Sequence, residues 1–200
     1  MVLERWAFPL IGMIGATSCA SVPVPGDVRR FDPFSAFPLV AAFAGGSARL
    51  IRAGAHYVRE DGTVDLEASY IPEGEHGAYY SLVRPVSANG PIGAAAHFQG
   101  VAVWVRRPGF RTERSGGPFQ SVTWDRGMTL EGTWPADDYA KDVVPAPTCS
   151  LLNLWSMAKQ HGASGGAVAV IVYDRAGYDF KIAGTSFHYV FDTECHLKNG

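Results

Sequence analysis

Apolar and polar residues alternate one by one in several short runs of this 200-residue chain. The runs at 63–70, 178–184 and 187–192 show the pattern most clearly, with bulky apolar side chains at every second position. Because consecutive side chains of a β-strand point to opposite faces of a sheet, each run predicts a strand that is buried on one side. Such strands are typical of antiparallel sheets with one face on a hydrophobic core. The sequence therefore predicts a mainly antiparallel β-sheet.

Turn signals between the apolar runs predict how the strands connect. Glu60-Asp61-Gly62 predicts a hairpin of 48–59, with a break at Gly54, and 63–70. Asp125-Arg126-Gly127 predicts a second hairpin, of 119–124 with 128–134. The run 97–107 is apolar on both faces, which favours a central strand. The remaining expected strands are 78–84, 167–173, 178–184 and 187–192.

One segment, 149–161, has the spacing of an amphipathic helix, with Thr148 as its N-cap and Gly162 as its end. The apolar residues expected on its packed side are Leu151, Leu152, Trp155 and Ala158. The expected fold class is α+β: a mainly antiparallel sheet with one C-terminal helix packed on a sheet, as an αββ-type unit. In its order of elements, this C-terminal unit loosely resembles small periplasmic helix-on-sheet modules such as PepSY-like domains, a resemblance that implies no activity.

Composition restricts the class of protein. The net charge of −2 argues against a nucleic-acid partner. With 47% hydrophobic and 18% charged residues, the chain can form a sizeable core, and general disorder is not expected. Its length fits one domain or one and a half. The expected division is a leader at 1–18, a tether at 19–38, a β-rich body at 39–145 and a helix-plus-strands unit at 146–200, the last two forming either two domains or one.

The N-terminal residues have the features of a secretory leader. A charged start leads into the apolar run 6–15, which is too short to span a bilayer, and then into Ala16-Thr17-Ser18-Cys19. This arrangement resembles the signal peptide and lipobox of bacterial lipoproteins. The resemblance implies cleavage before Cys19 and acyl chains on that residue, and Ala20 in place of Asp favours the outer membrane. An ordinary signal peptide cut nearby and an uncleaved amphiphilic start are the alternatives.

The remaining two of the three cysteines, Cys149 and Cys195, are then expected to form a disulfide in an oxidising compartment. The alternative is that Cys149, at a helix N-terminus, is a reactive thiol with a lowered pKa.

Two short motifs associated with nucleophilic serines occur in the chain. Residues 162–166 match G-x-S-x-G around Ser164, but a nucleophile elbow needs a strand before the serine and a helix after it, and here the expected order is reversed. Ser156 and Lys159 match S-x-x-K without the accompanying S-D-N and K-T-G motifs. We therefore expect no catalytic residue, and a Ser/Lys hydrolase is the least favoured alternative.

Metal-ligating residue types gather near the C-terminus without a recognised spacing. They are His188, Asp192, Glu194, Cys195 and His196. Because Cys195 is expected in a disulfide, no metal site and no cofactor are expected.

Two groups of residues are candidates for contact with another molecule. Arg106, Arg107, Arg111 and Arg114 lie in a stretch expected to be a loop, which fits an anionic or protein partner or simply a solvated loop. Tyr79 and Tyr80 are adjacent in a strand, so one of them is expected to be exposed for stacking on a ligand. The alternative is that these strand aromatics pack in the core. Trp104, Trp124 and Trp134 have the same two alternatives, contact with another molecule or packing in the core.

The expected function is that of a lipid-anchored protein on the periplasmic side of the cell envelope. It would act as a non-enzymatic interaction or accessory subunit that binds another envelope protein through the arginine-rich stretch and exposed strand edges. The alternative is a binding module for a glycan or small ligand.

Overall fold

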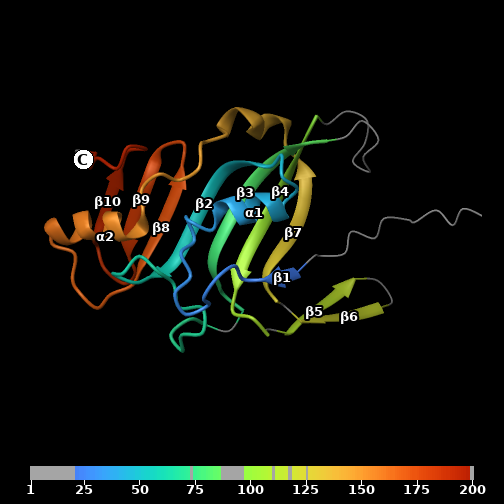
Figure 1. Cartoon of the computed structure of the whole chain (residues 1–200), viewed down its shortest axis with the longest axis horizontal. Helices are drawn as coiled ribbons and strands as arrows, with labels where there is room; N and C mark the ends of the chain where they lie inside the picture. The colour runs from blue at the N-terminus through green and yellow to red at the C-terminus, as the bar shows by residue number, and fades with distance from the viewer. Residues whose placement is uncertain are drawn as a thin grey trace, which may run out of the picture.

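The protein is an antiparallel β-sheet with α-helices on one face (Figure 1). The computed structural model describes residues 21–72, 74–86, 97–109, 111–116, 119–124 and 126–198, with the backbone alone for 111–116 and 119–124. Eight strands form the main sheet in the order β1-β7-β4-β3-β2-β8-β9-β10, and each pairing between them is antiparallel. The predicted sheet class is confirmed.

The strand bounds are β1 Ser21–Pro23, β2 Arg49–Val58, β3 His76–Pro85, β4 Phe98–Arg106, β5 Arg111–Gly116, β6 Phe119–Trp124, β7 Gly127–Pro135, β8 Ala169–Asp174, β9 Gly177–Ile182 and β10 His188–Phe191. The helices are α1 Phe37–Phe43, the 3-10 helix η1 Asp137–Asp142, and α2 Leu151–Gln160. Strands β5 and β6 pair with each other as a separate two-stranded sheet.

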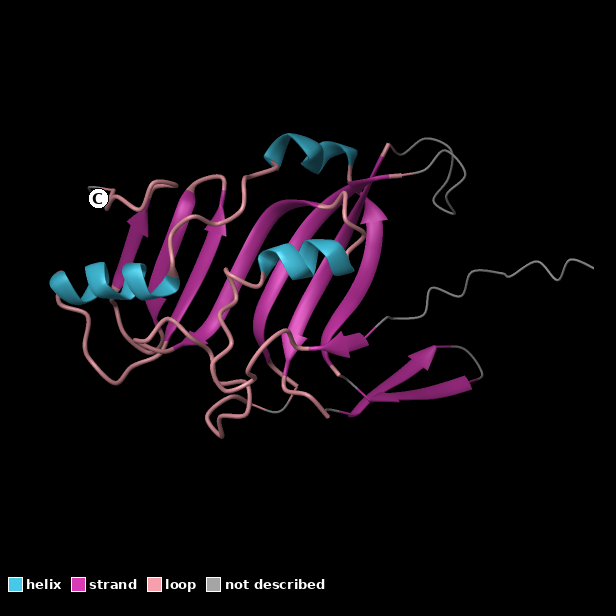
Figure 2. Ribbon diagram, in the orientation of Figure 1, coloured by secondary structure: helices cyan, strands magenta, loops and turns pink. Residues whose placement is uncertain are grey.

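Helices α1 and α2 lie on the same face of the main sheet, here called the helix face (Figure 2). The ring of Phe37 in α1 lies 6.5 Å from that of Tyr80 in β3, and the ring of Trp155 in α2 meets that of Phe180 in β9 edge-on at 5.1 Å. Because side chains alternate along a strand, the neighbours of these residues point to the opposite face, here called the open face. The residues of the open face used below are Arg52, His56, Tyr79, Ser81, Trp104 and Asp174.

Helix α2 differs in detail from the sequence prediction. Ser150, and not Thr148, caps it by accepting a hydrogen bond from the backbone N–H of Asn153 at 3.1 Å. The Thr148 hydroxyl donates instead to the carbonyl of Thr193. Leu152, expected on the packed side, is 56% exposed. The residues that α2 buries are Leu151, Leu154, Trp155 and Ala158.

Both predicted hairpins are wrong. Residues 63–70 form no strand, and Val64 makes one isolated bridge to Phe31. Strand β6 pairs with β5, whereas β7 pairs with β4 and β1. A turn signal shows that the chain reverses, but the partner of a strand depends on which neighbour completes the buried face.

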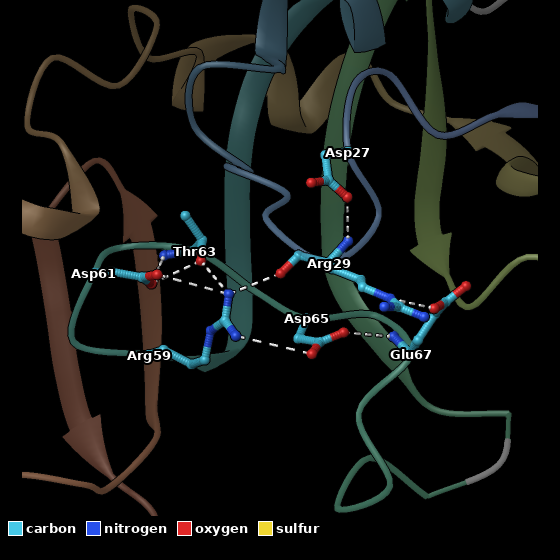
Figure 3. A network of polar contacts seen from close by, with 7 residues as sticks. All are labelled: Asp27, Arg29, Arg59, Asp61, Thr63, Asp65 and Glu67. Carbon is cyan, nitrogen blue, oxygen red and sulfur yellow. Dashed lines mark hydrogen bonds and ion pairs between the residues drawn. The ribbon is translucent and has the colours of Figure 1, made fainter.

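The segment that the sequence presents as a tether is part of the folded domain from residue 21 onward. Strand β1 extends the sheet beside β7, and Phe31 and Phe34 are 1% and 5% exposed. A network of polar contacts holds this segment to the loop after β2 (Figure 3). Arg59 donates to the Arg29 carbonyl at 2.7 Å, and Arg29 is paired with Glu67 at 2.8 Å.

The sheet also crosses the expected boundary at residue 146. Strand β2 pairs with β8, so that the N-terminal body and the helix-plus-strands unit share one sheet. Cys149 and Cys195 form the predicted disulfide, with 5.7 Å between their Cα atoms. This bridge joins the start of α2 to the segment that follows β10, and it removes Cys149 from consideration as a reactive thiol. Among the described residues, no helix has the length and apolar character needed to cross a membrane.

Candidate functional site

Four aromatic rings meet on the open face, and together they are here called the aromatic cluster: His56, His76, Tyr79 and Trp104. Tyr79 in β3 is the direct neighbour of Trp104 in β4, with 5.7 Å between ring centroids. His76 lies edge-on to Trp104 at 4.1 Å and 4.7 Å from His56 of β2. All four side chains are half-buried, so the cluster presents part of each ring to the surface.

Gly54 makes room for this cluster. It pairs with Tyr79 across β2 and β3, and a Cβ at this position would lie under 3.0 Å from three atoms of the Tyr79 ring. An aromatic ring that covers a glycine on the neighbouring strand shields the exposed backbone from water. The expected break of the strand at Gly54 is therefore wrong, and β2 runs through it without interruption.

The cluster holds its histidines in the neutral form. Burial, and then the neighbouring His56 and Arg106, lower the pKa of His76 to about 4. Burial also lowers the pKa of His56, with Glu75 acting in the opposite direction. Since both pKa values lie below the ordinary value, the pair carries no charge near pH 7 and forms a polar but uncharged surface.

A cleft of about 770 Å³ adjoins the cluster on the open face. Its volume falls within the range of small-molecule sites, about 300–1,000 Å³. Arg52 lines the cleft and also lies close enough to the Tyr79 hydroxyl to influence its pKa, which burial raises. The other lining residues with polar or aromatic side chains are Ser81, Trp134, Tyr139, Asp142, Asp174 and Arg175.

The two tyrosines selected from the sequence lie on opposite faces. Tyr79 belongs to the cluster, whereas Tyr80 is fully buried and donates a hydrogen bond to the carbonyl of Pro33 at 2.5 Å. Tyr80 is therefore a core residue, and its expected role in stacking on a ligand is wrong. The sequence contained a signal for this, because Ala78, Tyr80 and Leu82 form the more apolar side of the strand.

The arginine-rich stretch is not a single loop. Arg106 ends β4, and its guanidinium is paired with Glu131 of β7 at 2.6 Å and lies 5.5 Å from the centre of the Trp104 ring. Arg106 therefore stabilises the sheet, and the expectation that it contacts a partner molecule is wrong. Arg107 is exposed. Arg111 and Arg114 belong to strand β5, where side chains are outside the described part, as is that of Trp124.

Other residues named from the sequence lie apart from the cleft. Ser156 is exposed on α2, and Lys159 donates to the Glu60 carboxylate at 2.6 Å, so its ammonium group is held in a charged pair. Ser164 lies in the exposed loop between α2 and β8. In the described ranges, no group of three or more His, Cys, Asp and Glu residues is placed to hold a metal ion. Cys19 lies outside the described residues.

Sequence reasoning named Trp134 as a possible stacking residue but missed the cleft that it lines. Its residues come from β2, β3, β7, η1, the end of β8 and the turn that follows it, which are far apart in the chain. No protein-family model, curated protein or solved structure matches the chain.

Proposed function

We propose that the protein is a lipid-anchored, non-enzymatic binding protein of the bacterial cell envelope that holds a small ligand in the open-face cleft. The observation that carries this proposal is the cleft of about 770 Å³ beside the aromatic cluster. Binding sites of this kind combine apolar and aromatic surface with a few convergent polar groups. Here Trp134 and Tyr139 supply the aromatic surface, and Arg52 and Asp174 supply charged groups.

The proposed location in the cell envelope rests on the N-terminal leader and on the three cysteines. Acylation of Cys19 would place the anchor two residues before β1, which starts at Ser21 on the edge of the sheet. The Cys149–Cys195 bridge suits an oxidising compartment. Within this proposal, α2 and the three strands β8 to β10 form the C-terminal helix-plus-strands unit, which has one strand more than the expected αββ type. Mass spectrometry of the native protein tests this location. It should find Cys19 at the N-terminus with a diacylglyceryl adduct. An unmodified Cys19 would contradict the proposed lipid anchor.

The binding role is tested with the full chain, purified in detergent and screened by thermal denaturation against a chemically diverse library. A ligand that binds the folded state raises the melting temperature in a concentration-dependent way. We expect such a ligand, and we expect Tyr139→Ala to weaken its effect. Tyr70→Ala is the matched control, because Tyr70 is 48% exposed, Tyr139 is 49% exposed, and Tyr70 does not line the cleft. A screen in which no compound shifts the melting temperature would contradict the proposal.

A second candidate function is that of an accessory subunit of a membrane-associated complex. The observation in its favour is the hairpin of β5 and β6, which forms its own two-stranded sheet and extends away from the main sheet (Figure 1). It carries Arg111 and Arg114, and the exposed Arg107 precedes it. Detergent extraction and pull-down of the lipidated protein should then recover a stoichiometric partner that is lost when the three arginines are replaced by glutamate. Repeated purification of the protein alone would rule this candidate out.

A further inference from the structure

The aromatic floor of the cleft is a flat indole. Trp134 of β7 is the cross-strand neighbour of Gly100 of β4, and a Cβ on Gly100 would lie under 3.0 Å from three indole atoms. The nearest is Cε2, a ring-fusion atom whose three bonded neighbours all lie in the ring plane. An edge-on approach would meet Nε1 or a peripheral carbon first, so the indole presents its face to Gly100. Its opposite face is then available to the cleft, where Tyr139 adds a second aromatic side chain.

The polar groups around this floor are balanced in charge. Arg52 faces Asp174 at 3.8 Å, and Arg175 faces Asp142 at 3.6 Å. Both distances exceed those of hydrogen bonds, so each pair is held by charge and not by a direct hydrogen bond. Two guanidinium groups and two carboxylates therefore provide donors and acceptors close together without a net charge. The Ser81 hydroxyl adds a group that can both donate and accept.

This combination selects among ligand classes. A phosphate-bearing ligand would require an excess of positive charge, and each cleft arginine is already next to an aspartate. A fatty acyl chain would remove water from four charged groups whose pair distances exceed those of hydrogen bonds, and it offers them no hydrogen bond in return. A sugar ring has an apolar C–H face that fits a flat aromatic surface, and its rim of hydroxyl groups both donates and accepts hydrogen bonds.

Building on the proposed binding function, we infer that the ligand of the cleft is a neutral glycan, with one sugar ring stacked on Trp134 and its hydroxyl groups bound by the Arg52–Asp174 and Arg175–Asp142 pairs. The aromatic cluster extends the surface on the side of Arg52, where Tyr79 and Trp104 can contact further rings of an oligosaccharide. The neutral state of His56 and His76 keeps this extension uncharged.

The test is isothermal titration of the full chain in detergent with chitotetraose, cellotetraose and maltotetraose, and with inorganic phosphate and hexanoate as probes of other chemistry. We expect at least one neutral tetrasaccharide to bind. Trp134→Ala and Tyr139→Ala should each weaken binding about fivefold or more, as expected for the loss of an aromatic contact, and Tyr70→Ala should leave it unchanged. If Trp134→Ala does not fold by circular dichroism, Tyr139→Ala decides the test, because its side chain is 49% exposed.

The outcomes separate this inference from the function on which it rests. If phosphate or hexanoate binds with dependence on Tyr139 and no sugar binds, the glycan inference is overturned while the binding function stands. Sugar binding that neither variant weakens also overturns the inference. If none of these probes and no library compound binds, both the inference and the proposed function fail.

Discussion

Gly54→Ala should destabilise the protein because the Tyr79 ring occupies the space of the new methyl group. A Cβ at Gly54 would lie 2.6 Å from Cζ and 2.7 Å from Cδ1 of that ring, with Cε1 still closer. The ring has little room to move, since His56 and His76 each lie 5.7 Å from it. Overpacking of this kind costs about 1–3 kcal/mol. Replacing glycine also removes about 0.4–1 kcal/mol of unfolded-state entropy, so the net loss should be about 1.3 kcal/mol at mid-range and at most about 2.6 kcal/mol.

Urea denaturation followed by circular dichroism measures this loss as a change in the free energy of unfolding. The matched control is Gly165→Ala. Gly165 is exposed, and the nearest atom to its added Cβ is a Glu60 carboxylate oxygen at 3.2 Å, at the end of a side chain and needing to move only by a few tenths of an ångström. Neither glycine has a positive φ, so backbone strain does not distinguish the two variants. The control should be neutral, or stabilised by up to about 1 kcal/mol.

A double-mutant cycle tests the assigned cause. In a Tyr79→Ala background the ring is absent, and Gly54→Ala should then leave only the unfolded-state gain, a stabilisation of about 0.4–1 kcal/mol. The expected coupling energy between the two positions is about 1–3 kcal/mol, whereas independent sites add within about 0.3–0.5 kcal/mol. Additive effects would refute the argument that the tyrosine ring, and not the strand backbone, requires glycine here.

Three further predictions concern the core and the cluster. Replacing both Cys149 and Cys195 by alanine should lower the free energy of unfolding by about 4 kcal/mol, because the sequence separation of 46 defines a long loop in the unfolded chain; equal urea midpoints for this variant and the oxidised protein would contradict it. Trp155→Phe removes the indole N–H that donates to the buried Val58 carbonyl at 3.2 Å and should cost about 1–3 kcal/mol in thermal denaturation. Since the pKa of His76 is lowered to about 4, the unfolded chain binds a proton that the folded protein does not between about pH 6.5 and pH 4. Stability should therefore fall as pH drops through this window, by about 1–2 kcal/mol after allowance for solvent screening of a partly exposed ring, and His76→Gln should flatten that part of the profile.

Local patterns predicted individual strands better than their partners. The run 97–107 became β4, and 178–184 became β9, because a strand buried on one or both faces leaves its period in the sequence. The alternation at 63–70 has the same period, yet this segment forms no strand. There Val64 and Leu66 are buried against Gly77 of β3, so burial at every second residue arose without a strand ladder.

In the candidate site, too, local sequence patterns identified single residues but not their partners. Tyr79 could be selected from the sequence as one of two adjacent strand aromatics, and the apolar neighbours Ala78 and Leu82 already favoured Tyr80 as the buried one. From the sequence, Arg106 was expected to contact another molecule. Its ion-pair partner Glu131 is 25 residues away in the chain and is brought close only by the pairing of β4 with β7. A charge pair formed across a sheet has no local signal.

The sequence by itself determined the antiparallel class of the sheet and the position of the interior strand β4, and it indicated the pairing of Cys149 with Cys195. These follow from local periodicity and from the small number of cysteines, which a single chain displays directly. Only the tertiary structure decided the order of strands, the open face and the cleft formed by Trp134, Tyr139 and the charged pairs. The physical reason is that burial and strand pairing depend on contacts between residues that are distant in the chain. Which of several possible partners a strand takes depends on how the whole core packs.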